Sequence, residues 1–235
     1  MKSHCITRIA LGLTVTLGTI GCQPLLLQRP GALTSAASAF TLTSAAATPA
    51  GAVRHDVPFT TVGGQVLKLD LYYPTTPTYQ PLPVVVFIHG GSWQAGDKGD
   101  IQFGSDGLIL KELQARGFLI ASVNYRLAPG ALFPAPINDV RSAITYLQRE
   151  AGTINLDPQR VAAWGSSAGG HLAAMVGLTA SQGGGVTLKA VVDNFGPTDL
   201  TQESLYWQGE MAMVRDWTAL IGMSKKALPA WLKRY

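Results

Sequence analysis

A serine set between two glycines is the residue of this chain best placed to do chemistry. Residues 165–169 read GSSAG, with Ser167 at the centre, and they follow the apolar run RVAAW at 160–164. A helix-forming stretch of small residues comes next, at 170–176. Strand, tight turn and helix in this order are the context of a G-x-S-x-G nucleophile elbow, which exposes its central hydroxyl. The pattern predicts that Ser167 is a nucleophile for acyl transfer, provided that a base takes its proton.

A second glycine motif follows a second apolar run. Residues 83–88 read PVVVFI, which is typical of a strand buried on both faces, and residues 89–93 read HGGSW. Glycines directly after such a strand let the backbone turn and leave its N–H groups unobstructed. Such groups can stabilise the negative oxygen of a tetrahedral intermediate. The two motifs together favour an acyl-transfer site over a small-residue turn in a Rossmann-like sheet.

These motifs and two others resemble the esterase and lipase branch of the α/β-hydrolases. Residues 125–129 read YRLAP and residues 133–140 read FPAPINDV, and the motifs span the chain from about Val53 to Leu200. The resemblance is to hormone-sensitive-lipase-like enzymes and to bacterial feruloyl- and acetyl-esterase-like (BD-FAE-like) domains. It implies a serine carboxylesterase that forms an acyl-enzyme, acts on a small-molecule or polysaccharide-linked ester, and needs no cofactor or metal.

The resemblance also assigns an oxyanion hole. In that family the loop after the buried strand and the residue after the nucleophile supply the N–H donors, which here are Gly90, Gly91 and Ala168. Many lipase-like members carry a third glycine where this chain has Ser92 and Trp93. The form found here is closer to feruloyl-esterase-like and kynurenine-formamidase-like proteins, so an arylformamidase-like reaction is an alternative. Trp93 either lines the acyl pocket or covers the core.

The partners of the serine are harder to place. The family's order is serine, acid, then histidine on a loop well downstream, yet no histidine follows His171. His171 lies in the first turn of the elbow helix, where we expect it to point into the packing, and we expect His89 to orient the oxyanion loop. Asp199 is a candidate acid, in a segment that more often opens a cap.

The missing histidine leads to two hypotheses about the chain as a whole. The first is a truncated esterase that lacks the last strands of its sheet and is inactive as a 235-residue chain. The second is a membrane-tethered binding module that keeps the hydrolase cleft without its chemistry.

Alternating strands and helices are expected to position these residues. Hydrophobic periodicity predicts strands at 53–62, 65–73, 83–88, 118–123, 160–164 and 188–194. The glycine pair at 63–64 suits a hairpin turn between the first two strands. This order predicts an α/β fold, the α/β-hydrolase fold, with a mostly parallel central sheet and helices on both faces.

Two helices are predicted between the strands, at 105–116 and at 138–151, ended by Gly117 and Gly152. The apolar residues of the first are Leu108, Leu110 and Leu113, and those of the second are Val140, Ile144 and Leu147. A turn is predicted at 157–158, before the elbow strand. Arg126 and Asp139 are expected to form a buried pair that ties a strand-end loop to the second helix.

The N-terminal segment has a composition of its own. Two basic residues precede the apolar stretch 9–20, which is too short to span a bilayer and suits the core of a signal peptide within residues 1–22. Cys22 ends the sequence TIGC, which resembles a lipoprotein signal-peptidase site; cleavage nearer the Ala/Ser-rich segment is the alternative. Residues 23–52 are interpreted as a flexible tether and residues 53–235 as the hydrolase domain. We therefore expect an exported protein, either an envelope lipoprotein lipidated at Cys22 or a secreted one.

The distribution of charge argues against a nucleic-acid partner. The formal net charge of +4 comes from the two ends, because residues 53–224 hold 11 basic and 14 acidic side chains. No basic face is implied. Both cysteines, Cys5 and Cys22, lie in the export segment, so the body is expected to have neither a disulfide nor a cysteine metal site.

Overall fold

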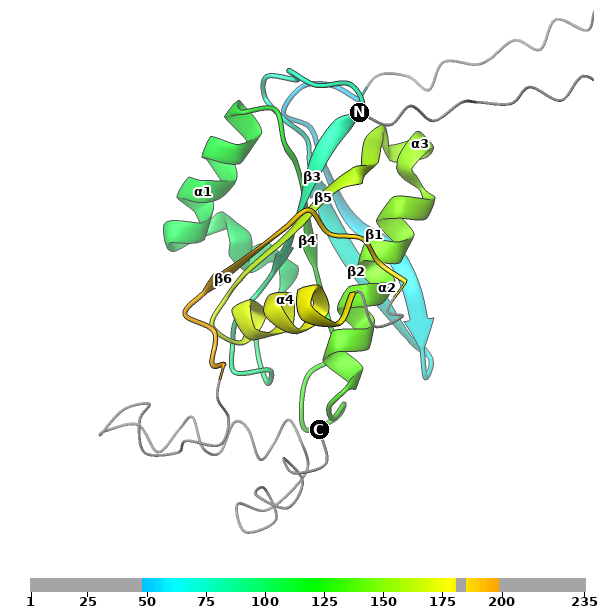
Figure 1. The fold of residues 1–235 in the computed structure, drawn as a ribbon, viewed down its shortest axis with the longest axis vertical. Helices are drawn as coiled ribbons and strands as arrows, with labels where there is room; N and C mark the ends of the chain where they lie inside the picture. Colours follow the sequence, from blue (N-terminus) through cyan, green and yellow to red (C-terminus); the bar gives the residue numbers. More distant parts are fainter. Residues whose placement is uncertain (1–47, 181–184, 199–235) are drawn as a thin grey trace, which may run out of the picture. The chain divides into compact units, whose positions relative to one another are not determined.

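The computed structural model describes residues 48–180 and 185–198 (Figure 1). Within them lies a six-stranded sheet with the order β1-β2-β4-β3-β5-β6. Its strands are β1 (Val53–Val62), β2 (Gln65–Tyr72), β3 (Leu82–Ile88), β4 (Leu119–Val123), β5 (Leu156–Ser166) and β6 (Ala190–Asn194). β2 pairs antiparallel with β1 and with β4, whereas β4, β3, β5 and β6 are parallel neighbours. The predicted mostly parallel sheet is confirmed.

Helices cover both faces of this sheet (Figure 1). The 3₁₀-helix η1 (Lys98–Gln102) and α1 (Gly104–Ala115) pack on one face, and α2 (Ala135–Arg149) and α4 (Ala168–Thr179) pack on the other. The chain leaves β3 to form α1 and β4, then crosses back through α2 to form β5 on the other side of β3. The order of the strands therefore reverses at β3. Ligands of open α/β sheets bind beside such a reversal, at the carboxyl ends of the strands. The loops after β3 and β5 meet there.

β3 contributes to two separate cores because it is buried along its whole length. Val84, Val86 and Ile88 pack in the cluster that includes α2 and α4. Val85 and Phe87 point to the opposite face, into the cluster that includes η1 and α1. Alternate side chains of a strand face opposite sides, so one apolar run fills both layers. The prediction of a strand buried on both faces is confirmed.

The first hairpin also follows the prediction. Gly63 and Gly64 join β1 to β2 with φ angles of 57° and 82°. Two successive positive φ angles define the type I′ turn that matches the twist of a two-residue hairpin, and glycine adopts them without a Cβ clash.

The first helix lies one residue before its predicted bounds, at 104–115 instead of 105–116, and not all of its apolar residues are buried. Leu108 is 70 % exposed, while Gly107, Leu110 and Gln114 are the buried positions of α1. Residues two apart lie about 200° apart around a helix, so Leu108 and Leu110 cannot face the same core. Gly117, with a φ of 88°, follows the helix as expected.

The prediction for the second helix is wrong about its ends. α2 begins at Ala135, with prolines beside its first turn, where a missing N–H costs nothing. It ends at Arg149, and Gly152 lies inside the separate short helix α3 (Ala151–Ile154). Left-handed Asn155 closes that helix, and β5 begins at once, so residues 157–158 lie in the strand and not in a turn. The predicted apolar residues of α2 are all buried: Val140, Ile144 and Leu147.

Several predictions fall outside the described residues. They concern the apolar stretch 9–20, Cys22, most of the tether 23–52, and Asp199. These stay predictions. Among the residues that the structure describes, no helix is both long and apolar enough to cross a bilayer.

Candidate active site

β5 passes into α4 through a single sharply turned residue, Ser167. Its φ of 55° and ψ of −122° lie in a region that a residue with a Cβ rarely adopts. The turn is held from two sides, because the Ser167 N–H donates to the carbonyl of Asn194 at 2.9 Å and its own carbonyl accepts the N–H of His171 at 3.1 Å. The structure therefore has the strand, turn and helix that the sequence predicts for this segment. The role of Ser167 as a nucleophile stays a prediction.

Two glycines make this turn sterically possible. A Cβ on Gly165 would lie 2.3 Å from the backbone of Gly169, and a Cβ on Gly169 would lie 2.0 Å from the carbonyl oxygen of Ile88. Both distances are shorter than any real carbon contact, so no larger residue fits without moving β3 or β5. The close approach of these backbones brings the loop after β3 against the elbow.

The structure brings the loop after β3 next to the serine. A Cβ placed on Gly90 would lie 3.5 Å from the Cβ of Ser167. Ala168 is the first residue of α4, where backbone N–H groups have no partner inside the helix. Gly91 follows Gly90 with a φ of 99°, and its carbonyl accepts the N–H groups of residues 94 and 95. Gly90 and Ala168 thus lie beside Ser167 on two adjoining segments, and Gly91 follows Gly90 in the same loop.

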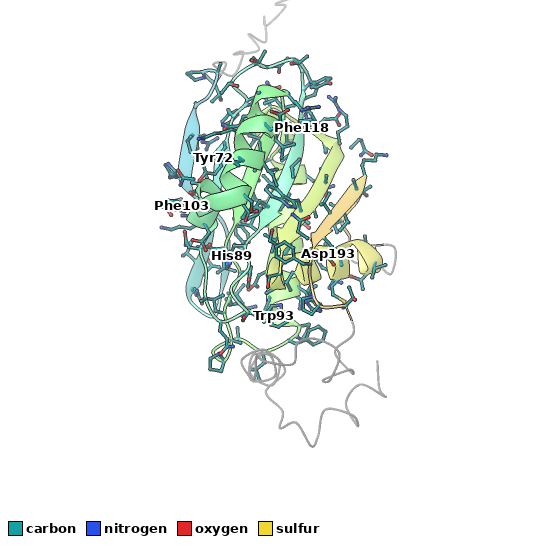
Figure 2. The ribbon with its side chains drawn as sticks, turned by 90° about the vertical axis from the view of Figure 1, so that its left-hand side faces the viewer. Tyr72, His89, Trp93, Phe103, Phe118 and Asp193 are labelled. Carbon is teal, nitrogen blue, oxygen red and sulfur yellow. The ribbon has the colours of Figure 1, made fainter. Side chains whose placement is uncertain are left out.

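Trp93 belongs to the core. Its side chain is only 2 % exposed and packs edge-to-face on the ring of His171, with 5.2 Å between the ring centroids. This contact joins the loop after β3 to the first turn of α4. Figure 2 shows His89, Trp93 and Asp193 toward one end of the sheet, with Phe118 at the opposite end. Of the two interpretations left open by the sequence, the structure favours core cover.

His171 points into the packing, as expected. Burial lowers its pKa to about 4, an effect that the nearby carboxylate of Asp193 opposes. Its Nδ1 atom has no hydrogen-bond partner among the described residues. A buried imidazole that stays neutral and packs on Trp93 is a structural group, and nothing in its surroundings directs it to Ser167.

The other described histidines are also engaged away from the serine. His55 lies on a bulge of β1, where its Nδ1 is 2.9 Å from Asp70. His89 Nδ1 lies 2.8 Å from the carbonyl oxygen of Gly90, and burial lowers its pKa. Within residues 48–180 and 185–198, therefore, no imidazole is hydrogen bonded to Ser167. The candidate acid Asp199 lies outside that part of the chain.

The predicted pair of Arg126 and Asp139 is confirmed. The Asp139 carboxylate is buried and accepts three hydrogen bonds from Arg126, from the backbone N–H at 2.9 Å, Nε at 2.8 Å and Nη2 at 2.8 Å. The two bonds from the guanidinium form a bidentate contact, which joins the loop after β4 to α2. It is the geometry in which a guanidinium binds a carboxylate best.

One hydrogen bond of the elbow could not be predicted from residues close to it in the sequence. The Ser166 hydroxyl turns toward α1 and donates to the Asp106 carboxylate at 3.3 Å. Burial raises the pKa of Asp106, and the hydrogen bond from Ser166 opposes that rise. The two residues are 60 positions apart, so only the folded chain brings them together. Ser166 therefore anchors the elbow to the α1 face of the sheet.

A groove of about 620 Å³ lies beside the oxyanion loop but away from Ser167. Its polar lining includes Lys68 of β2, Asp97, and Asn124 and Arg126 after β4. These polar groups already have partners within the protein: Lys68 pairs with Asp56, Asn124 donates to Asp97, and Arg126 pairs with Asp139. In the described residues no group of three His, Cys, Asp or Glu side chains is arranged to hold a metal ion.

Known proteins resemble this chain in sequence and in fold. The BD-FAE family model matches residues 69–234. Esterase LipC of Mycobacterium tuberculosis is 32 % identical over 145 residues, which are 58 % of this chain and 35 % of that protein. A bacterial heroin esterase superposes with a TM-score of 0.61 at 27 % identity, over 74 % of this chain and 55 % of its own. An arylesterase gives 0.63 at 26 % identity, over 79 % and 62 %. The chain thus spans about a third of LipC and little more than half of the heroin esterase.

Proposed function

Because the chain belongs to the BD-FAE family and has the α/β-hydrolase fold, we propose that it is a serine carboxylesterase whose nucleophile is Ser167. The observation that carries the proposal is the strained backbone of Ser167, which is held at a positive φ between two glycines that admit no Cβ. Strain of this kind is kept at functional sites, where it fixes the direction of a reacting group.

The proposed reaction proceeds through an acyl-enzyme. Ser167 Oγ attacks the ester carbonyl carbon and loses its proton to a base, while the carbonyl electron pair moves onto the oxygen. The N–H groups of Gly90, Gly91 and Ala168 donate to that oxyanion, each worth about 3 kcal/mol of transition-state stabilisation. The electron pair then returns, the alkoxide leaves and takes up a proton, and water later repeats the attack on the acyl-serine.

The base is the part of this reaction that the described residues do not provide. His55, His89 and His171 are engaged elsewhere, and the sequence holds no histidine beyond His171. A serine that has no base keeps only the contributions of the oxyanion hole and of binding. The 235-residue chain is therefore expected to hydrolyse esters near the background rate.

The proposed substrates are acetyl, short acyl or feruloyl esters, small or attached to a polysaccharide. The HGGSW form of the oxyanion loop and the BD-FAE match support this class. The name arylesterase, carried by one structural relative, is consistent with aryl esters as well.

The proposed place of action is outside the cytoplasm. The basic residues Lys2 and Arg8, the apolar stretch 9–20 and the TIGC sequence ending at Cys22 support export with a lipid on Cys22. Mass spectrometry of the N-terminus of protein made in a bacterial host tests this. A diacylated Cys22 is expected; an unmodified N-terminus in the region 36–47 would mean free secretion instead.

Covalent labelling tests the nucleophile. The 235-residue chain, Ser167→Ala and the matched control Ser166→Ala are incubated with a fluorophosphonate, and intact mass is followed with time. We expect slow addition of one label to wild type and to Ser166→Ala, and none to Ser167→Ala. A label that persists in Ser167→Ala would refute the nucleophile. Rapid labelling of wild type would show that the chain contains a base after all.

A further inference from the structure

Tyr125, two residues after the end of β4, is tied to the loop that follows β3. Its ring stacks on the ring of His89, with centroids 4.3 Å apart and planes inclined by 13°. Its buried hydroxyl donates to the carbonyl oxygen of His89 at 3.0 Å and lies 3.3 Å from that of Gly90. One side chain thus contacts both peptides at the start of the oxyanion loop.

The imidazole of His89 completes this arrangement. Its Nδ1 lies 2.8 Å from the carbonyl oxygen of Gly90. A carbonyl oxygen can only accept, so Nδ1 carries the proton and donates it. The carbonyl of His89 is therefore held by Tyr125, and the carbonyl of Gly90 chiefly by His89.

The planarity of the peptide bond turns these two contacts into control of two N–H groups. In a trans peptide the C=O and the following N–H point in opposite directions. The carbonyl of His89 shares its peptide with the N–H of Gly90, and the carbonyl of Gly90 shares its peptide with the N–H of Gly91. Holding both carbonyls on the Tyr125 side directs both N–H groups away from it. These are the two donors that this loop offers to an oxyanion.

We propose that Tyr125 is a positioning residue of the oxyanion hole, acting through its hydroxyl on the His89–Gly90 peptide. This role rests on the proposed esterase function of Ser167. Without the hydroxyl, the stacked ring would remain but the first peptide of the loop would lose its hydrogen bond. The N–H of Gly90 would then sample directions that no longer meet the oxyanion, and preorganised donors are what make such a hole effective.

Tyr125→Phe tests the role because it removes one oxygen and keeps the stacked ring. Tyr73→Phe is the matched control, since the Tyr73 hydroxyl is also buried but has no hydrogen-bond partner among the described residues. The first readout is the ¹³C carbonyl chemical shifts of His89 and Gly90 in the labelled 235-residue chain. We expect an upfield shift at His89, and a smaller one at Gly90, in Tyr125→Phe alone.

The second readout is the rate at which a fluorophosphonate labels Ser167, because its phosphoryl oxygen occupies the place of the oxyanion. We expect Tyr125→Phe to label about tenfold more slowly than wild type, a smaller loss than the ~10²-fold that follows removal of a whole donor. Tyr73→Phe should stay within about twofold. Unchanged carbonyl shifts, or changed shifts with an unchanged labelling rate, would overturn the proposal. A wild type that never labels at Ser167 would refute the esterase function itself, while the carbonyl shifts would still report the hydrogen bonds.

Discussion

Replacing His171 with phenylalanine should remove an acid sensitivity of the fold. Burial lowers the pKa of His171 from 6.5 to about 4, against the opposing effect of Asp193. Between these two values the unfolded chain binds a proton at this residue and the folded chain does not. The folded state therefore loses stability as the pH falls from about 6.5 toward 4, and gains it as the pH rises.

The size of the effect follows from the two pKa values. Integrating the proton linkage of His171 from pH 7.5 to pH 5.0 gives a loss of about 2 kcal/mol in the free energy of unfolding. Phenylalanine does not titrate, yet it keeps an aromatic ring against Trp93. The stability of His171→Phe relative to wild type should therefore improve by about 2 kcal/mol on going from pH 7.5 to pH 5.0, whatever its value at pH 7.5.

Urea unfolding of both proteins at the two pH values, followed by tryptophan fluorescence, measures this difference. Equal slopes against denaturant would show that the variant unfolds to a similar state, so that midpoints can be compared. A stability difference that does not change with pH would refute the reasoning. So would an NMR titration in which the His171 ring of the folded wild type protonates near pH 6.5.

Two other substitutions test the charged contacts around the site. Asp139→Ala should lower the free energy of unfolding by about 3–5 kcal/mol, because it leaves Arg126 without its buried partner. As a control, Glu112→Ala, in an exposed helical ion pair, should cost less than about 1 kcal/mol. Equal losses of stability for the two variants in urea titrations would contradict this. Asp106→Asn should raise the melting temperature relative to wild type at pH 7 but not at pH 3, because burial raises the pKa of Asp106 and so disfavours its ionised form, while the amide still accepts from Ser166. A gap that is the same at both pH values would argue against that cause.

The elements that carry the candidate site could be predicted because their signals are local. The apolar run in β3 is continuous since both of its faces are buried, and that burial appears in the sequence as an unbroken pattern. Gly165 and Gly169 signal the elbow because only glycine fits where those backbones touch. The pairing of Arg126 with Asp139 could likewise be expected from a charged residue at a strand end and another in the next helix.

Features that depend on distant contacts left no such signal. The hydroxyls of Tyr125 and Ser166 find their acceptors 36 and 60 residues away, and only the sheet order brings them together. Leu108 shows that an apolar residue in a predicted helix need not be buried: it is exposed, because helical geometry places it about 200° away from the buried Leu110. Gly152 suggests a helix stop, but α2 already ends at Arg149 and Gly152 lies inside α3, which the left-handed residue Asn155 closes.

The position of β3 between β4 and β5 also bears on how the chain emerges from the ribosome. Roughly 80 residues separate the end of β3 from the end of β5, and at about 5–20 residues per second their synthesis takes on the order of 4–16 s. During that time one edge of the most apolar strand has no neighbour, and such an edge readily pairs with other chains. We therefore expect residues 83–88 to be the segment of the nascent chain that most needs the protection of a chaperone.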